Sequence, residues 1–321
     1  MDLEAQAESS AVHAHGVGTS TGPIPRASII VPAYRSEATI ARSLRTLLAQ
    51  DFHDYEVIVV DSSPDDRTEG LVRGQFPQTR YLHSRERLLP HAARNRGVDL
   101  ARGETLVFTD PDIYAPVDWL SRLVSAHERL GGAVAGGLAC HGRRWVELGM
   151  HMCKFDPWLP GGSERRIDIS PTANMACLRS VWAAAGGFTE QSMLGDALLS
   201  WRLTQMGVPI WFVPEAVVEH HHMGTWAELL RERFARGQEF AVLRMERGQW
   251  PNGRTLGHFF LTVIPLRLAH LVWRGVRNAS RARLLAEYLR VSPVPITGQA
   301  AWLGGEAAAY LRALRRPMAS A

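Results

Sequence analysis

The chain has 321 residues, 46% of them hydrophobic, which is enough for one large globular α/β domain or two small ones. The formal charge is only +4, and Lys154 is the single lysine among 36 basic residues, so the arginine content by itself indicates no nucleic-acid partner. The three cysteines are widely spaced, which excludes a disulfide framework and indicates a reducing compartment.

The first half of the chain alternates between short apolar runs and amphipathic segments. Residues 1–26 show no periodicity and no apolar core, so we expect a disordered leader and not a signal peptide. This alternation predicts βαβ units and an α/β fold with a mostly parallel sheet. We expect strands at 27–32, 55–61, 80–83, 105–110 and 133–138, and helices at 38–49, 67–75, 91–101 and 117–130.

The alternation stops after about residue 140. Residues 145–162 are rich in Trp, Met and Pro without a period, and we expect a loop that covers a cleft. Further elements are expected as a strand and turn at 167–178, a short helix ending at Gly186-Gly187, a helix at 196–206, strands at 210–213 and 217–221, and an arginine-rich helix at 226–244.

The most apolar stretch is 257–276, but Pro265, Arg267 and His270 make it a poor membrane-spanning helix. Its apolar positions, Trp273 and the flanking arginines suit a helix that lies in a membrane interface. A helix buried in the protein core is an equally good interpretation.

Two carboxylates follow the buried strand that ends near Thr109. Asp110 and Asp112 fall at its carboxyl end, where open α/β sheets bind their ligands, on the rim that also carries Tyr34 and Asp61. Carboxylates this close repel each other unless a cation compensates, and a hard divalent metal bridged to a phosphate is the usual solution. The alternative is a simple Asp-Pro-Asp turn. No Gly-x-Gly-x-x-Gly follows the first strand, so we do not expect a dinucleotide site.

Several short motifs occur in a fixed order along the chain. They are Val31-Pro32-Ala33-Tyr34 with Glu37, Val59-Val60-Asp61 and its acidic turn, Ala92-Ala93-Arg94-Asn95-Arg96-Gly97, Asp110-Pro111-Asp112, Gly186-Gly187-Phe188, Gly195-Asp196 with Arg202, and Pro214 to His220. In this order they resemble the inverting family 2 glycosyltransferases over roughly residues 27–240. The resemblance implies a GT-A fold, with a Rossmann-like central sheet, flanking helices and a smaller acceptor-side subregion.

The resemblance also implies roles for single residues. Asp61 would bind the nucleotide base, Arg94 the base or diphosphate, and Asp110 the ribose. Asp112 and His220, with His222 as the substitute, would hold Mn²⁺ or Mg²⁺, and Asp196 would be the general base. A structural alternative for Asp196 is a helix N-cap. Pro32, Ala33, Tyr34 and Glu37 would complete the nucleotide-sugar site. The family usually has Glu-Asp where this chain has Gly195-Asp196.

The expected activity is metal-dependent transfer of a sugar from a UDP- or dTDP-sugar to an acceptor hydroxyl of a glycan, a lipid-linked molecule or a small molecule. The chain lacks the Gln-x-x-Arg-Trp motif of processive synthases, so we expect one sugar per encounter. Residues 27–139 would form the nucleotide-sugar half, 140–240 the acceptor half, and 241–321 a helical extension. We expect a cytoplasmic enzyme of the bacterial cell envelope, with possible peripheral contact to the plasma membrane. A catalytically silent relative and a sugar-phosphate nucleotidyltransferase are the alternatives.

Overall fold

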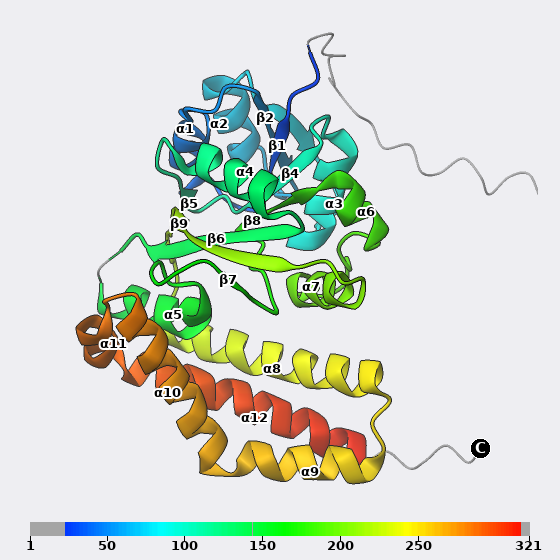
Figure 1. The fold of residues 1–321 in the computed structure, drawn as a ribbon, viewed down its shortest axis with the longest axis vertical. Helices are drawn as coiled ribbons and strands as arrows, with labels where there is room; N and C mark the ends of the chain where they lie inside the picture. The colour runs from blue at the N-terminus through cyan, green and yellow to red at the C-terminus, as the bar shows by residue number, and fades with distance from the viewer. Residues whose placement is uncertain (1–22, 143, 316–321) are drawn as a thin grey trace, which may run out of the picture.

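One nine-stranded sheet organises the first two thirds of the chain (Figure 1). The computed structural model describes residues 23–142 and 144–315, so most of the leader expected at 1–26 lies outside the described residues. The strand order is β3-β2-β1-β4-β8-β6-β9-β5, with β7 paired to β9. The first four strands in this order run parallel, joined by helices: β1 (Ala27–Ala33), α1 (Ile40–Leu47), β2 (Tyr55–Asp61), α2 (Arg67–Gln75), β3 (Arg80–His83), α3 (Pro90–Leu100) and β4 (Thr105–Thr109).

The second half of the sheet is mixed. Strand β8 (Asn174–Leu178) lies antiparallel between β4 and β6 (Ala133–Cys140), so the expected parallel pairing is found among β3, β2, β1 and β4 and again between β6 and β9, but not across β8. The other elements here are β5 (Ile113–Tyr114), α4 (Trp119–Leu130), α5 (Trp145–Phe155), the short 3₁₀ helix η1 (Asp156–Trp158), β7 (Arg165–Arg166), α6 (Arg179–Ala184), α7 (Gly195–Gln205) and β9 (Ile210–His220).

Both faces of the sheet are covered, which explains the unbroken apolar runs in its central strands. On one face Ile29 and Val31 pack in a core that contains Leu44 of α1 and Trp119 of α4. On the other face Ile30 belongs to a second core with α3, α6 and α7, formed among others by Val98, Val181, Leu199 and Leu203. Successive residues of β1 therefore serve opposite cores.

Two expectations for the second half are wrong. Residues 145–155 form helix α5 and not a loop, because its apolar side chains serve two different cores and leave no single stripe in the sequence. Leu148 and Met152 pack toward two later helices, α10 (Pro265–Arg281) and α11 (Leu285–Val291), whereas Met150 and Cys153 pack toward Val294 and Leu229. The two short strands expected at 210–213 and 217–221 are one strand, β9, in which Pro214 sits where the pairing with β6 shifts register. A proline is tolerated at such a bulge because no ladder donor is needed there.

Five helices form a layer beside the sheet domain (Figure 1). They are α8 (Trp226–Gly248), α9 (Asn252–Val263), α10 (Pro265–Arg281), α11 (Leu285–Val291) and α12 (Pro293–Arg315). The prediction of a single helix over 257–276 is wrong. The helix is interrupted at Ile264-Pro265, because proline has no N–H to donate in a continuous helix. Helices α8 and α12 approach closely at Gly237 and Gly305, where a Cβ atom would lie 2.2 Å and 2.0 Å from a carbonyl oxygen of the other helix.

Buried ion pairs fix this helical layer. The fully buried Glu306 of α12 accepts hydrogen bonds from Arg267 of α10 at 2.7 and 2.8 Å and from Trp302 Nε1 at 2.6 Å. Arg274 of α10 binds both oxygens of Asp156 in η1, at 2.8 and 3.0 Å. The first pair holds α10 to α12, and the second holds α10 to the sheet domain.

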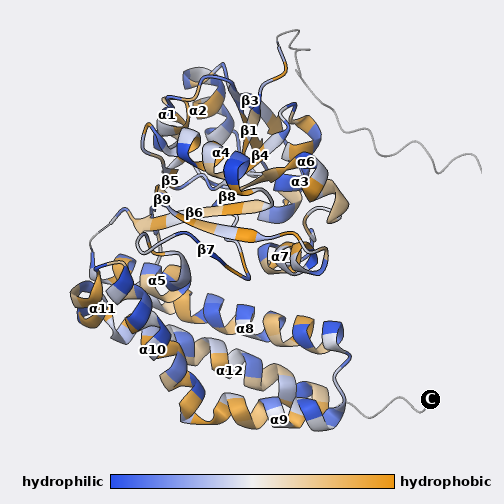
Figure 2. Cartoon of the chain, viewed as in Figure 1, coloured by the Kyte–Doolittle hydropathy of each residue, from blue (hydrophilic) through white to orange (hydrophobic). Residues whose placement is uncertain are grey.

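The hydropathy of α9 and α10 is uneven along and around the helices (Figure 2). Among the described residues, no single helix has the length and apolar character needed to cross a membrane; α9 and α10 reach both only as a pair, which is bent by 63°.

The amide of Asn174 closes the irregular part of the sheet. Its Nδ2 donates to the carbonyls of Gly137 and Ala216, at 3.0 and 2.8 Å, and its Oδ1 accepts from Trp119 Nε1 at 2.9 Å. These carbonyls lie at the register shift between β6 and β9, where ladder partners are missing. A buried polar group without a partner costs about 1–3 kcal/mol.

Replacing Asn174 by Leu should therefore lower the free energy of unfolding by about 3 kcal/mol or more, measured by urea denaturation. Thr109→Val is the matched control, because the buried Thr109 hydroxyl makes one hydrogen bond, to Ala173 O at 3.1 Å. Its loss should cost about 1 kcal/mol. Equal effects of the two changes would contradict the role given to Asn174.

Candidate active site

A cavity of about 920 Å³ lies between the rim of the sheet and the helical layer. It is bounded by the ends of β1, β4 and β9, the start of α7, and side chains from α8, α10 and α12. Eight of the ten residues singled out from the sequence line it: Pro32, Ala33, Tyr34, Arg94, Asp110, Asp112, Asp196 and His220. Glu37 and Asp61 are not among its lining residues.

Three potential metal ligands meet at the rim. Asp110 follows β4, Asp112 precedes β5, and His220 is the last residue of β9. Each offers one ligand atom, and these atoms lie within 4.8 Å of one another. Pairing of β5 with β9 places Ile113 opposite His220, and His221 N donates to Asp112 O at 2.9 Å. Residues more than a hundred positions apart are thus held together by backbone hydrogen bonds.

The charges of this cluster are only partly balanced. Burial and, next, the negative charge of Asp110 raise the pKa of Asp112 to about 7. Burial lowers the pKa of His220 to about 4, so its imidazole is neutral at physiological pH. His220 Nε2 lies 3.7 Å from Asp112 Oδ1, and its buried Nδ1 has no hydrogen-bond partner among the described residues. Two carboxylates and a neutral imidazole are ligands that Mn²⁺ accepts.

His222 is bonded elsewhere. His151 Nε2 lies 3.0 Å from Leu138 O, so this nitrogen carries the proton that the carbonyl accepts. Burial lowers the pKa of His151 to about 3, which makes its Nδ1 an acceptor. His222 Nε2 lies 3.0 Å from that atom and donates to it, while the His222 ring stacks on His220 at 4.4 Å between centroids. This arrangement favours His220 over His222 as the ligand.

Arg94 of α3 is buried and forms an ion pair with Asp110. Asp110 therefore has a cation beside it, whereas no guanidinium of the described residues forms an ion pair with Asp112. The neighbouring Asn95 faces the other way: its amide exchanges hydrogen bonds with the backbone of Phe188 at 2.9 and 3.0 Å. The Arg-Asn and Gly-Gly-Phe motifs are thus in contact, and Asn95 serves the fold and not the cavity.

Asp196 is the second residue of α7 and faces the cavity. The N-cap of this helix is Leu194, so the cap role considered for Asp196 is wrong; its Oδ1 instead accepts from Ala197 N at 2.8 Å. Burial raises the pKa of Asp196, and the charge of Arg236 opposes that rise. The preceding Gly195 packs under the ring of His91, where a Cβ would lie 2.6 Å from Cδ2. There is consequently no room for an acidic side chain at position 195.

Helix α8 holds the segment that leads into α7. Glu239 Oε1 accepts from Ser192 Oγ at 2.6 Å and from Met193 N at 3.0 Å. Arg236 donates to Met193 O at 3.4 Å. The position of Asp196 therefore depends on the helical layer as well as on the sheet.

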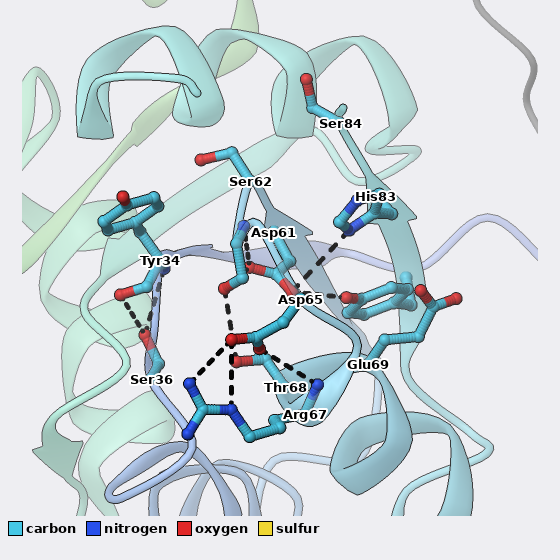
Figure 3. A network of polar contacts seen from close by, with 12 residues as sticks. Tyr34, Ser36, Asp61, Ser62, Asp65, Arg67, Thr68, Glu69, His83 and Ser84 are labelled. Carbon is cyan, nitrogen blue, oxygen red and sulfur yellow. Dashed lines mark hydrogen bonds and ion pairs between the residues drawn. The ribbon is translucent and has the colours of Figure 1, made fainter. Parts of the chain in front are cut away.

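Asp61 lies at the end of β2 inside a network of polar contacts (Figure 3). Its side chain is fully buried, with Oδ1 accepting from Ser63 N at 2.9 Å and Ser63 Oγ at 2.6 Å, and Oδ2 accepting from Tyr81 OH at 2.6 Å. His83 Nδ1 lies 3.9 Å away. Both carboxylate oxygens of Asp61 therefore accept hydrogen bonds from within the protein, and the residue lies beside the cavity and not in its lining.

Two further predicted residues, Glu37 and Tyr34, each contact an arginine. Glu37 forms an ion pair with Arg67 at 3.2 Å. The ring of Tyr34 lines the cavity and lies under the guanidinium of Arg87, with 4.6 Å from the guanidinium carbon to the ring centroid. Sequence reasoning missed the residues that support the site, among them Tyr81, His91, His151 and Glu239. Tyr81, His91 and His151 lie in β3, α3 and α5, and no sequence motif marks them as residues that support a site.

Comparisons with known proteins agree with this geometry. The family described as Glycosyl transferase family 2 matches residues 28–180. Glycosyltransferase AglE of Haloferax volcanii is 24% identical over 84% of this chain and 91% of its own. The GalNAc(5)-diNAcBac-PP-undecaprenol beta-1,3-glucosyltransferase of Campylobacter jejuni is 31% identical over 28% of this chain and 30% of its own.

The fold has a counterpart among solved structures. The mannosyltransferase PcManGT of Pyrobaculum calidifontis, solved in complex with GDP-Man and Mn²⁺, superposes with a TM-score of 0.58 at 22% identity, over 90% of this chain and 88% of that one. The sheet with its paired strands, the order of the motifs and the family match lead to one conclusion. Residues 28–180 are those of a family 2 glycosyltransferase, and the chain has the GT-A fold.

Proposed function

We propose that this glycosyltransferase is inverting, depends on a divalent cation, and transfers one sugar per encounter from a nucleoside-diphosphate sugar to an acceptor hydroxyl. The observation that carries the proposal is the placement of two groups in one cavity. The Asp110–Asp112–His220 cluster lies on the sheet rim, and the carboxylate of Asp196 faces the same space from α7. A leaving group and an attacking group can thus be served from different walls.

In this proposal the donor lies along the sheet rim. Tyr34 and Arg94 line the part next to β1 and α3, and Pro32 and Ala33 supply backbone there. Asp61 acts on the nucleotide base in one of two ways. It either positions the turn that its hydrogen bonds with Ser63 hold in place, or it binds the base itself once that turn has rearranged. We expect a UDP- or dTDP-sugar as the donor.

Asp112 and His220, with Asp110 beside them, would hold Mn²⁺ or Mg²⁺. The oxygen and imidazole donors and the unpaired charge of Asp112 fit such an ion. When bound, the cation neutralises charge that develops on the diphosphate leaving group.

Asp196 acts on the acceptor. Its carboxylate accepts the proton of the acceptor hydroxyl while that oxygen bonds to the anomeric carbon, and the bond from this carbon to the diphosphate oxygen breaks. The nucleoside diphosphate leaves with the electron pair. A single displacement of this kind inverts the anomeric configuration. The ion pair with Arg94 holds Asp110 in place, and the hydrogen bond from Met193 N to Glu239 holds the segment before α7 in position.

A first test concerns the metal. In wild-type protein, Mn²⁺ should increase the thermal stabilisation given by UDP or dTDP, because the ion joins the carboxylates to the diphosphate. Asp112→Asn should remove this metal dependence without changing the melting temperature of the ligand-free protein by more than a few degrees. Asp99→Asn, on the exposed face of α3, is the control. Nucleotide binding that is equally tight in EDTA would contradict the metal assignment.

A second test concerns Asp196. Proton transfer by a positioned base is worth about 10²–10⁴ in rate, so Asp196→Asn should lower kcat by that factor with little change in donor affinity. The base must be ionised, so kcat should fall as the pH drops through the raised pKa of Asp196, and the variant should lose this limb. Asp54→Asn, at an exposed position before β2, should behave as wild type. Wild-type turnover in Asp196→Asn would move the base elsewhere.

We further propose that the bend between α9 and α10 rests on an anionic membrane surface. Phe260 and Leu266 are 54% and 77% exposed, and Trp273 is 53% exposed on the same helix as Leu266. Arg254 and Arg277 flank these side chains and can meet anionic headgroups. This contact would bring the cavity near a membrane-bound acceptor.

Vesicle sedimentation tests this contact. Wild-type protein should bind vesicles with anionic lipid weakly, and added salt should release it. In a Leu266→Ser, Trp273→Ser double variant, the partition coefficient onto the vesicles should fall about tenfold or more, because burying one large apolar side chain is worth about 1.5–3 kcal/mol. Met206→Ser changes an exposed apolar residue of the sheet domain, 45% exposed, and should have no effect. Equal sedimentation of all three proteins would contradict the proposed surface.

A further inference from the structure

The cavity continues past the donor rim into an arginine-rich compartment under the helical layer. A stripe of α10, spaced by three and four residues, faces it, and further lining comes from α8, α12 and residues 153–169. The stripe consists of Arg267, Leu271, Arg274, Asn278 and Arg281. Arg267 and Arg274 are matched by Glu306 and Asp156, respectively. Within the described residues, Arg281 has no carboxylate at ion-pair distance.

A second unmatched cation lies close to the first. Arg165 of β7 donates to Pro157 O at 3.1 Å and stacks over Phe212 at 4.1 Å, but forms no ion pair with any described carboxylate. Burial lowers the pKa of Arg165, and the positive charge of Arg281 lowers it further. Two guanidinium groups from distant segments therefore repel each other across the cavity.

Arg233 of α8 is a third unmatched cation. It donates weakly to Gln299 Oε1 at 3.3 Å and lies over Trp302 at 4.3 Å, while its buried Nε has no partner in the described structure. The nearest acid in sequence, Glu232, is already shared by Lys154 and Arg236, each at 3.0 Å. Burial lowers the pKa of Arg233. A charge so placed is costly unless an anion compensates it.

Structural reasons account for the matched arginines but not for these three. A fold needs no arginine that repels its neighbour inside a cavity, and a planar guanidinium is suited to binding phosphate oxygens in pairs. The donor diphosphate is assigned above to the cluster on β4 and β9, which lies on the other wall. The arginine-rich compartment begins beside Asp196, whose pKa responds to the charge of Arg236.

We propose that Arg165, Arg233 and Arg281 form an anion site that holds a phosphate or diphosphate group of the acceptor, so that its hydroxyl reaches Asp196. This inference rests on the proposed function and adds the chemical class of the acceptor. The group can belong to a lipid headgroup or to a soluble phosphorylated saccharide, since both present the same oxygens. Asn278, which lies on the same stripe, donates to Asp156 Oδ2 at 3.0 Å, so the oxygens of Asp156 are already bound by Asn278 and Arg274.

Calorimetric titration in EDTA tests the site with two probes, farnesyl diphosphate below its micellar concentration and glucose 1-phosphate. At least one should bind the wild-type protein. Arg233→Gln and Arg281→Gln should each weaken that binding roughly 10- to 100-fold, the value of a hydrogen bond to a charged group. Asp112→Asn should bind as wild type, because this site needs no metal. Arg290→Gln, an exposed arginine of α11 outside the cavity, is the matched control.

The same variants titrated with UDP and Mn²⁺ should give the reverse pattern, with loss only in Asp112→Asn. Binding of farnesyl diphosphate alone assigns the site to a lipid headgroup, binding of glucose 1-phosphate alone assigns it to a phosphorylated saccharide, and equal binding of both shows that the site recognises the phosphate group itself. The proposal is overturned if neither probe binds, or if Arg281→Gln, at an exposed position where the fold should survive, binds as wild type. A wild-type protein that binds a probe but does not bind UDP with Mn²⁺ would contradict the proposed function and leave the anion site standing.

Discussion

The repulsion between Asp110 and Asp112 is the constraint on which the candidate site depends. Arg94 compensates the first carboxylate through a buried ion pair. The Oδ1 atom of the second lies 3.7 Å from Nε2 of the neutral His220, and burial with the charge of Asp110 raises the pKa of this carboxyl to about 7. An apolar residue in place of Asp112 would remove this repulsion together with the affinity for a cation, whereas one in place of Asp110 would leave the buried Arg94 without its partner. The rim thus keeps an electrostatic cost that a bound ion would relieve.

The shape of the sheet follows from bringing His220 to this rim. Strand β9 crosses beside β6, shifts register at Pro214 and ends next to β5, so that His220 faces the carboxylates. The shift leaves carbonyls without ladder partners, and the Asn174 amide supplies the missing donors. The buried Asn174, a polar residue in a core, is therefore a condition for the position of His220, the proposed metal ligand. Fold and chemistry share the same few hydrogen bonds.

The helical layer turns the open edge of a sheet into a cavity. Glu306 and Asp156 each neutralise an arginine of α10 and fix the layer in place. The arginines without such partners lie in the same space and give it a positive potential. Glu239 of α8 accepts a hydrogen bond from Met193 N, just before α7, so the position of Asp196 at the start of α7 depends on the helical layer. A change in α8 can reach Asp196 through two hydrogen bonds.

The sequence by itself determined the α/β fold, the order of elements to residue 140 and most of the rim. Local information suffices there, because apolar runs, helical periods and strand-end carboxylates are short-range patterns. It gave the loss of an acid at Gly195 but no reason; His91, a hundred positions earlier, occupies the space that a side chain would need. The sequence did not predict helix α5, because its apolar side chains are divided between two cores. It did not predict that β9 is a single strand, because a shift in register interrupts the pairing of β9 with β6. Only the tertiary structure decided three further features. They are which arginines form ion pairs, that Nδ1 of His220 has no hydrogen-bond partner among the described residues, and that α10 lines the cavity. Each of them depends on partners far apart in the chain.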